Sequence, residues 1–128
     1  MTSYLKIFTN LMNQFLLELT EIFPDEKNLQ TYYFSVTSIN KVNPRMSLDY
    51  FKYYVMPFKS LIEERNEKYF IDEEYQENVG LSENSIVHGT RLKELWKVMS
   101  DDTKEKVWQY FENLIKIIEM EENAKRKN

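Results

Sequence analysis

Residues 3–23 read SYLKIFTNLMNQFLLELTEIF, and this stretch decides the fold. Its bulky apolar side chains recur at steps of three and four, at Leu5, Phe8, Met12, Phe15, Leu19 and Ile22. Side chains at that spacing line one face of an α-helix. Thr2 or Ser3 supplies an N-cap, and Pro24 ends the helix after Phe23. The stretch therefore predicts an amphipathic helix about 30 Å long, the central packing element of the chain.

Residues 29–39 keep the helical spacing, although their composition favours a strand. Their bulky apolar side chains are Leu29, Tyr32, Tyr33, Val36 and Ile39. Aromatic and β-branched residues are enriched in strands, so composition and spacing disagree here. Because the spacing is helical, a second helix is predicted, with Asp25 as its cap and Asn43-Pro44 as its end.

A third helical pattern covers residues 48–62 and contains a proline. After Ser47, its apolar positions are Leu48, Phe51, Val55, Phe58 and Ile62. Pro57 has no backbone N–H and clashes with the preceding turn of a helix. The sequence therefore predicts either a helix that kinks at Pro57 or two short helices that meet there.

Residues 66–83 lose this periodicity and gather carboxylates. Gly80 supplies the flexible residue of a loop, and a loop of this length is a candidate for a mobile or partner-binding segment. Its acids include Asp72, Glu73, Glu74, Glu77 and Glu83. Their spacing lacks the alternating ligands, glycine and distal glutamate of a calcium-binding EF-hand loop, so a solvated acidic loop is predicted.

Two helices are predicted in the last third of the chain. The apolar positions are Leu92, Leu95, Trp96 and Met99 in the first, and Val107, Trp108, Phe111, Leu114, Ile115 and Ile118 in the second. Ser100 caps the second helix, and acids in its first turn complement the helix dipole. Trp96 and Trp108 are expected to pack on one another's helices near this turn. Residues 121–128 are expected to fray.

Together these patterns predict an all-α protein, an irregular bundle of about five helices. The chain has 128 residues, of which 42% are apolar, enough for one core without a disulfide or a structural metal. We expect a single helical domain over residues 1–120, followed by a charged C-terminal tail at 121–128. No apolar run approaches the length that spans a bilayer, and cysteine is absent, so an intracellular protein is expected.

Catalytic, cofactor and metal sites have little support in the sequence. His88 is the only histidine, and without cysteine a metal site or a catalytic triad would depend on distant carboxylates. Ser85 and Ser100 lie outside the nucleophile-elbow motif. Two glycines in the whole chain exclude a glycine-rich phosphate loop. We therefore expect a non-enzymatic protein with no catalytic residue, no cofactor and no metal.

Two segments resemble small helical proteins of nucleocytoplasmic large DNA viruses. The first, Leu92 to Phe111, reads LKELWKVMSDDTKEKVWQYF and joins two amphipathic helices through a Ser-Asp cap. The second, Tyr53 to Lys59, reads YYVMPFK and is followed by Ile62, Glu67, Tyr69, Phe70 and Ile71. Asn66 departs from the acid expected before Glu67. The resemblance covers about half of the chain; it implies action in the host cytoplasm, the nucleus or the virion, and no particular activity.

Residues 41–59 form the basic part of an acidic chain whose net charge is −4. The cations are Lys41, Arg45, Lys52 and Lys59, interleaved with Tyr50, Phe51, Tyr53 and Tyr54. Charge combined with aromatic stacking is how many proteins hold single-stranded nucleic acid, so nucleic-acid binding is the alternative function. The positive surplus is small, however, and core packing explains the tyrosines better.

The preferred prediction is a structural or protein-binding role. Helices rich in Tyr, Phe, Trp and Met leave aromatic surface after a small core is filled, and such surface is favoured at interfaces. The residues expected to bind a protein partner or a second copy are Tyr50, Tyr53, Tyr54, Tyr69, Phe70 and Trp96. No membrane role is expected, because residues 3–23 carry one lysine and two glutamates, a poor match to anionic lipid.

Overall fold

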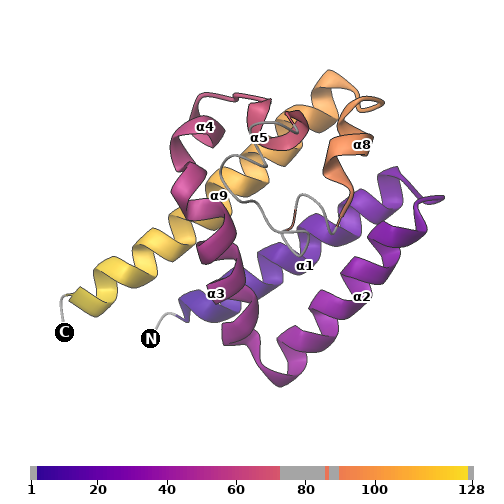
Figure 1. The fold of residues 1–128 in the computed structure, drawn as a ribbon. Coiled ribbons are helices and arrows are strands. Elements are labelled where there is room, and N and C mark those ends of the chain that lie inside the picture. The colour runs from indigo at the N-terminus through magenta and orange to yellow at the C-terminus, as the bar shows by residue number, and fades with distance from the viewer. Residues whose placement is uncertain (1–2, 73–85, 87–89, 127–128) are drawn as a thin grey trace.

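A computed structural model describes residues 3–72, 86 and 90–126, and within these ranges the regular elements are helices, with no strand. They are α1 (Tyr4–Ile22), α2 (Lys27–Val42), α3 (Pro44–Val55), the 3₁₀ turn η1 (Met56–Phe58), α4 (Lys59–Glu63), α5 (Lys68–Ile71), α8 (Leu92–Trp96) and α9 (Asp101–Arg126). The predicted all-α bundle is therefore confirmed (Figure 1).

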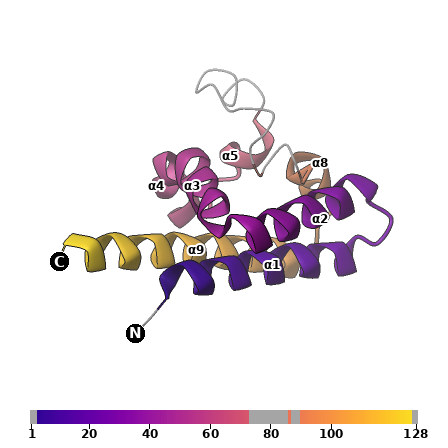
Figure 2. The same ribbon diagram turned by 90° about the horizontal axis from the view of Figure 1, so that it is seen from below.

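Two long antiparallel helices form the base of the bundle. α1 and α9 lie side by side and run in opposite directions (Figure 1). α2 returns along α1, and α3 then leads away from α2 towards α4 and α9 (Figure 1). Seen from below, α3, α4, α5 and α8 lie on one side of the α1–α9 pair (Figure 2). The apolar core fills the space between these two layers.

The centre of the core forms where α1, α3 and α9 meet. Phe8 of α1 and Phe51 of α3 make an edge-to-face contact, with 5.5 Å between ring centroids. Phe15 and Phe111 make another at 5.7 Å, and Phe51 contacts Phe111 at 5.6 Å. Burial of each such ring stabilises the fold by about 1.5–3 kcal/mol relative to an exposed ring. The apolar face predicted for residues 3–23 therefore packs at the centre, except at its end, where Ile22 is 37% exposed.

Serine caps begin both long helices, as the sequence predicts. Ser3 Oγ accepts a hydrogen bond from the backbone N–H of Lys6 at 3.2 Å, and α1 ends shortly before Pro24. Ser100 Oγ accepts one from the backbone N–H of Thr103 at 3.2 Å. Each bond satisfies an N–H group that the first turn of a helix leaves without a partner.

α2 confirms the helix predicted over residues 29–39 and corrects its beginning. It begins at Lys27, after Glu26, and no side chain caps it, so the prediction of Asp25 as the cap is wrong. α3 begins at Pro44, earlier than the predicted pattern after Ser47. Proline suits the first position of a helix, because the N–H group that it lacks has no intrahelical partner there.

Pro57 separates two helices. α3 ends at Val55, Met56–Phe58 form a single 3₁₀ turn, and α4 begins at Lys59. The structure therefore has the second of the two predicted alternatives, in which short helices meet. The proline lies at the start of the 3₁₀ turn, where its missing N–H group breaks no hydrogen bond of a longer helix.

The loop predicted over residues 66–83 is wrong in its first part. Lys68–Ile71 form the single-turn helix α5, and Tyr69 and Phe70 are 0% exposed. Buried aromatic rings hold this turn against the rest of the bundle, so it is part of the core. Residues 73–83, with most of the predicted acidic loop, lie outside the described residues.

Phe70 lies at the centre of an aromatic cluster that joins α5, α8 and α9. Its ring stacks on Trp96 with 4.6 Å between centroids and contacts Trp108 at 4.9 Å. Trp96 and Trp108 meet edge to face at 5.2 Å, which confirms their predicted packing. Lys104 Nζ lies 5.5 Å from the centroid of Trp96, within the range of a cation–π contact.

α9 continues to Arg126, whereas the sequence predicted fraying from residue 121. Glu121 forms an ion pair with Arg45 of α3 at 2.7 Å, and Glu122 forms one with Lys52 at 2.5 Å. The prediction missed these partners because they come from a helix far away in the sequence. The last turns of α9 pack beside α3 and are not a frayed tail.

Candidate functional site

Three of the four cations that the sequence singled out for nucleic acid are paired within the chain. Arg45, Lys52 and Lys59 follow one another at intervals of seven residues, the spacing of one helix face. Their partners on α9 are Glu121 at 2.7 Å, Glu122 at 2.5 Å and Glu119 at 2.5 Å. These pairs fasten α3 and α4 to the C-terminal half of α9.

Arg65 continues this row of ion pairs beyond α4. Its guanidinium binds Glu105 at 2.7 Å and also binds Glu112. Arg65 has a φ of 52°, the left-handed conformation that often ends a helix. We call Arg45, Lys52, Lys59 and Arg65, together with their partners on α9, the ion-pair ladder.

The ion-pair ladder favours the charged form of both partners. The hydrogen bond from Arg65 lowers the pKa of Glu105, and the bond from Lys52 lowers the pKa of Glu122. The hydrogen bond to Glu119 raises the pKa of Lys59. Because carboxylates neutralise these cations, little of the positive surplus remains for a phosphate backbone. Lys41 is exposed near the end of α2 and lies outside the ladder.

We expect the ion-pair ladder to make stability fall in acid. A carboxylate whose pKa is lowered on folding contributes stability above its unfolded pKa, and this contribution is lost as the pH falls through the folded pKa. The free energy of unfolding should therefore decrease below pH 4.5, the ordinary pKa of glutamate, because Glu105 and Glu122 become protonated. Urea unfolding at a series of pH values measures this decrease.

The double variant Glu105→Gln, Glu122→Gln tests the assignment of the acid sensitivity. It should have a flatter pH profile than the parent protein, because amides do not titrate. Glu64→Gln is the matched control, since Glu64 is exposed at the end of α4. Three profiles of equal steepness would contradict the assignment.

Tyr50, Tyr53 and Tyr54 form an aromatic surface on the outer side of α3. The exposed fractions are 74% for Tyr53 and 52% for Tyr50. Tyr54 is half-buried between them, edge-on to Tyr53 at 5.0 Å and stacked with Tyr50 at 5.8 Å. Core packing, the favoured explanation of these residues, is therefore wrong for Tyr50 and Tyr53. We call the three residues the tyrosine surface.

The other three residues predicted to bind a partner are interior residues. Tyr69, Phe70 and Trp96 have exposed fractions of 0%, 0% and 2%. The hydroxyl of Tyr69 donates a hydrogen bond to the backbone oxygen of Tyr54 at 3.0 Å, so it supports the tyrosine surface from beneath. Their aromatic rings are used in packing α5 and α8 and present no contact surface.

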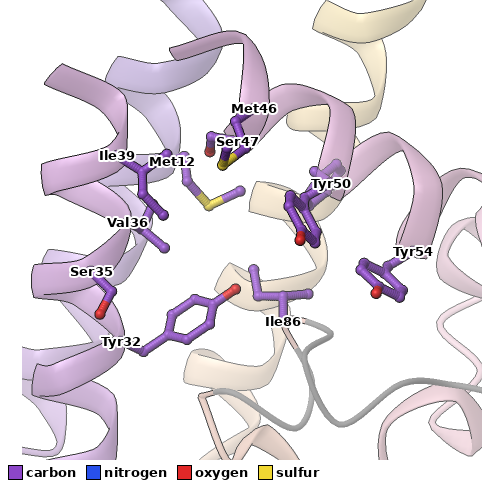
Figure 3. Close-up of a pocket in the computed structure, with 11 residues that line it drawn as sticks. Met12, Tyr32, Ser35, Val36, Ile39, Met46, Ser47, Tyr50, Tyr54 and Ile86 are labelled. Carbon is purple, nitrogen blue, oxygen red and sulfur yellow. The ribbon is translucent and has the colours of Figure 1, made fainter. Parts of the chain in front are cut away.

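A pocket of about 230 Å³ lies beside the tyrosine surface, between α1, α2 and α3 (Figure 3). It is lined by Met12, Tyr32, Ser35, Val36, Ile39, Met46, Ser47, Tyr50, Phe51, Tyr54 and Ile86. All of these side chains are uncharged at neutral pH, and most are apolar. We call this cavity the α2–α3 pocket.

The hydroxyl of Tyr32 is the main polar group of the α2–α3 pocket. Its ring projects from α2, and its hydroxyl points into the space between α2 and α3 (Figure 3). Burial raises the pKa of Tyr32 to about 12, so the hydroxyl keeps its proton at physiological pH. Within the described part of the chain this hydroxyl has no hydrogen-bond partner.

The sequence analysis predicted no pocket, although two of the lining residues were among its partner-binding candidates. Tyr50 and Tyr54 were singled out, whereas Tyr32, Ile39 and Met46 were assigned to helix faces or left aside. One signal was available in the sequence. Tyr32, Val36 and Ile39 share one side of the predicted helix, and all three line the pocket.

Most of the remaining sequence candidates fall outside the part of the chain that the structure describes. His88, Ser85 and Glu73 to Glu83 lie outside the described residues, and Ser100 is a helix cap. Among the described residues, no three acidic or histidine side chains gather in a way that would hold a metal ion. In the same part of the chain, no helix has both the length and the apolar character needed to cross a membrane.

Comparison with protein-family models, with curated proteins and with solved structures gives no match for this chain. The tyrosine surface and the α2–α3 pocket are therefore interpreted from their geometry alone. The tyrosine surface lies on α3, the pocket lies between α1, α2 and α3, and both consist of neutral side chains.

Proposed function

We propose that the protein is a non-enzymatic binding protein that contacts a protein partner through the tyrosine surface. The observation that carries this proposal is Tyr53, a large aromatic side chain that is 74% exposed and is held edge-on against Tyr54 at 5.0 Å. Tyrosine is enriched at the energetic centres of interfaces, because it offers a large contact area and a polar tip.

The surroundings of the tyrosine surface support the same function. Contacts with Tyr54 restrict the rings of Tyr50 and Tyr53, and Tyr69 in turn binds the backbone of Tyr54. A partner therefore orders few additional side chains on binding, which lowers the entropic cost of association. Met46, exposed on the same helix, adds an adaptable apolar neighbour.

Nucleic-acid binding is not the function favoured by the contacts on α3 and α4. A phosphate-binding surface works by exchanging its counterions for phosphates. On this face, α9 already supplies the counter-charges of Arg45, Lys52 and Lys59. A neutral aromatic surface on the neighbouring side of α3 fits a protein partner better.

Tyr53→Ala is expected to weaken partner binding by about 5- to 30-fold, because truncation of a central interface tyrosine removes about 1–2 kcal/mol of binding free energy. The stability of the free protein should change by no more than about 0.5 kcal/mol, since the side chain is exposed. Phe34→Ala is the matched control, because Phe34 is 73% exposed on α2 and should leave binding unchanged.

A photo-reactive phenylalanine analogue placed at position 53 identifies the partner, and titration of that partner with the parent protein, Tyr53→Ala and Phe34→Ala then measures the affinities. Binding of a second copy is measured by sedimentation of the purified protein. Binding of other proteins is detected by cross-linking in lysate of the source cells. The same analogue at Asn113, an exposed position of α9, is the reference. The proposal fails if position 53 gives no cross-link beyond that reference and the protein sediments as a monomer.

A further inference from the structure

The α2–α3 pocket has the form of a site for a small molecule. Its deeper wall consists of Met12, Phe51 and Ile86, which are buried. Its mouth lies at Met46 and Tyr50, which are exposed. A site with a buried apolar wall and one open side lets a ligand enter and lose most of its contact with water.

The volume of the pocket limits the size of the ligand. An apolar cavity of about 150 Å³ holds a benzene molecule. The α2–α3 pocket measures about 230 Å³, roughly one and a half times as much. Two fused rings therefore match its volume, whereas a single ring would leave space unfilled.

The chemistry of the walls limits the charge of the ligand. No lysine, arginine, aspartate or glutamate occurs among the described lining residues, and a tyrosine hydroxyl such as that of Tyr32 is neutral at physiological pH. An ion in such surroundings would lose its hydration without gaining a counter-charge. A neutral molecule is therefore strongly preferred.

One polar group of the ligand has a partner in the pocket. The hydroxyl of Tyr32 points into the cavity (Figure 3) and has no hydrogen-bond partner in the described part of the chain. Tyr32 is half-buried, and a hydrogen bond between the ligand and this hydroxyl would add modestly to the affinity. Met12 and Met46 on either side have flexible side chains that adapt to the ring system.

We propose that the α2–α3 pocket binds a neutral bicyclic aromatic molecule that carries one hydrogen-bonding group, with this group at Tyr32 and the rings between α1, α2 and α3. This site is separate from the protein-binding role proposed for the tyrosine surface. It does not require a protein partner, although Tyr50 and Tyr54 belong to both.

Indole is a suitable probe, because it is neutral and bicyclic and carries a single N–H group. Titration of isotope-labelled protein with indole, followed in the amide NMR spectrum, should give a Kd below about 1 mM, with shifts concentrated in the pocket-lining parts of α1, α2 and α3. Indole carboxylate has the same rings with a negative charge and should not bind.

Two variants test the placement of the probe. Tyr32→Phe keeps the ring and removes the hydroxyl, so indole should bind about 3- to 10-fold more weakly. Ser47→Leu adds a branched side chain inside the pocket and should abolish binding. Ser60→Leu places the same side chain on the exposed face of α4 and should bind indole like the parent protein.

Each alternative outcome separates the small-molecule site from the protein-binding surface. Saturation with shifts outside the helices that line the pocket, α1, α2 and α3, or equal affinity for indole carboxylate, would overturn the proposal. If Tyr32→Phe binds indole as tightly as the parent protein does, the polar group of the ligand does not bind Tyr32, and this result would also overturn the proposal. Absence of indole binding together with cross-linking at position 53 would reject the small-molecule site and retain the protein-binding function.

Discussion

Replacement of Phe70 with alanine is expected to lower the free energy of unfolding by about 3–5 kcal/mol, the range for truncation of a fully buried phenylalanine. The ring is 0% exposed and contacts Trp96, Trp108 and Phe111 at 4.6, 4.9 and 5.4 Å between centroids. These three partners lie on α8 and α9, so the cavity left by the ring would loosen the contacts of α5 with both helices. Denaturant unfolding followed by tryptophan fluorescence measures the loss.

The matched control is Phe34→Ala, the same change at a side chain that is 73% exposed on α2. Its expected effect is within about 0.5 kcal/mol, because no buried contact is removed. If Phe70 belonged to a solvated acidic loop, as the sequence predicted, the two variants would have similar stabilities. A difference below about 1 kcal/mol would therefore contradict the position of α5 in the core.

The long helices were predictable because their information is local. Residues 3–23 repeat the helical spacing over several turns, and Ser3 and Pro24 mark their ends. The apolar face of α9 repeats in the same way from Val107 to Ile118. A pattern of this length outweighs weak local preferences, which is also why Lys27–Val42 form a helix despite their strand-like composition.

α5 was not predictable, because a single turn is too short to display a periodicity. Lys68–Ile71 place one buried pair, Tyr69 and Phe70, next to each other in the sequence. What makes them a helix is the aromatic cluster supplied by Trp96 and Trp108, and these contacts span many residues. Tertiary packing of this kind is not visible in a local pattern.

The tyrosine surface and the ion-pair ladder differ in what the sequence revealed. The tyrosines were identified by residue type, but their exposure depends on which side of α3 packs against the core. The cations at 45, 52 and 59 repeat every seven residues, which indicated a basic helix face. Their partners, Glu121, Glu122 and Glu119, do not repeat with that period, so only the fold, which places α9 against α3 and α4, reveals the pairing.

The α2–α3 pocket could not be predicted from the sequence, because a cavity is a property of three surfaces at once. Met12, Val36 and Phe51 each occupy an apolar position that would suit an ordinary core. The space remains because α2 and α3 diverge from their common turn at Asn43 (Figure 1). Helix directions of this kind follow from side-chain packing, which a list of helical faces does not determine.

Ile118→Ala is expected to lower the free energy of unfolding by about 2–5 kcal/mol, because Ile118 is fully buried in the C-terminal half of α9. Two ion pairs follow it in the next turn, Lys59 with Glu119 and Lys52 with Glu122, so this part of α9 is held by α3 and α4. Ile7→Ala on the exposed side of α1 is the control and should change stability by about 0.5 kcal/mol at most. Hydrogen exchange of the α9 amides gives the local measurement: strong protection up to Glu122 in the parent protein, lost in Ile118→Ala, is the expected result. If the last turns of α9 frayed, their amides would exchange rapidly in both proteins, and this half of the helix could not fasten α3 and α4.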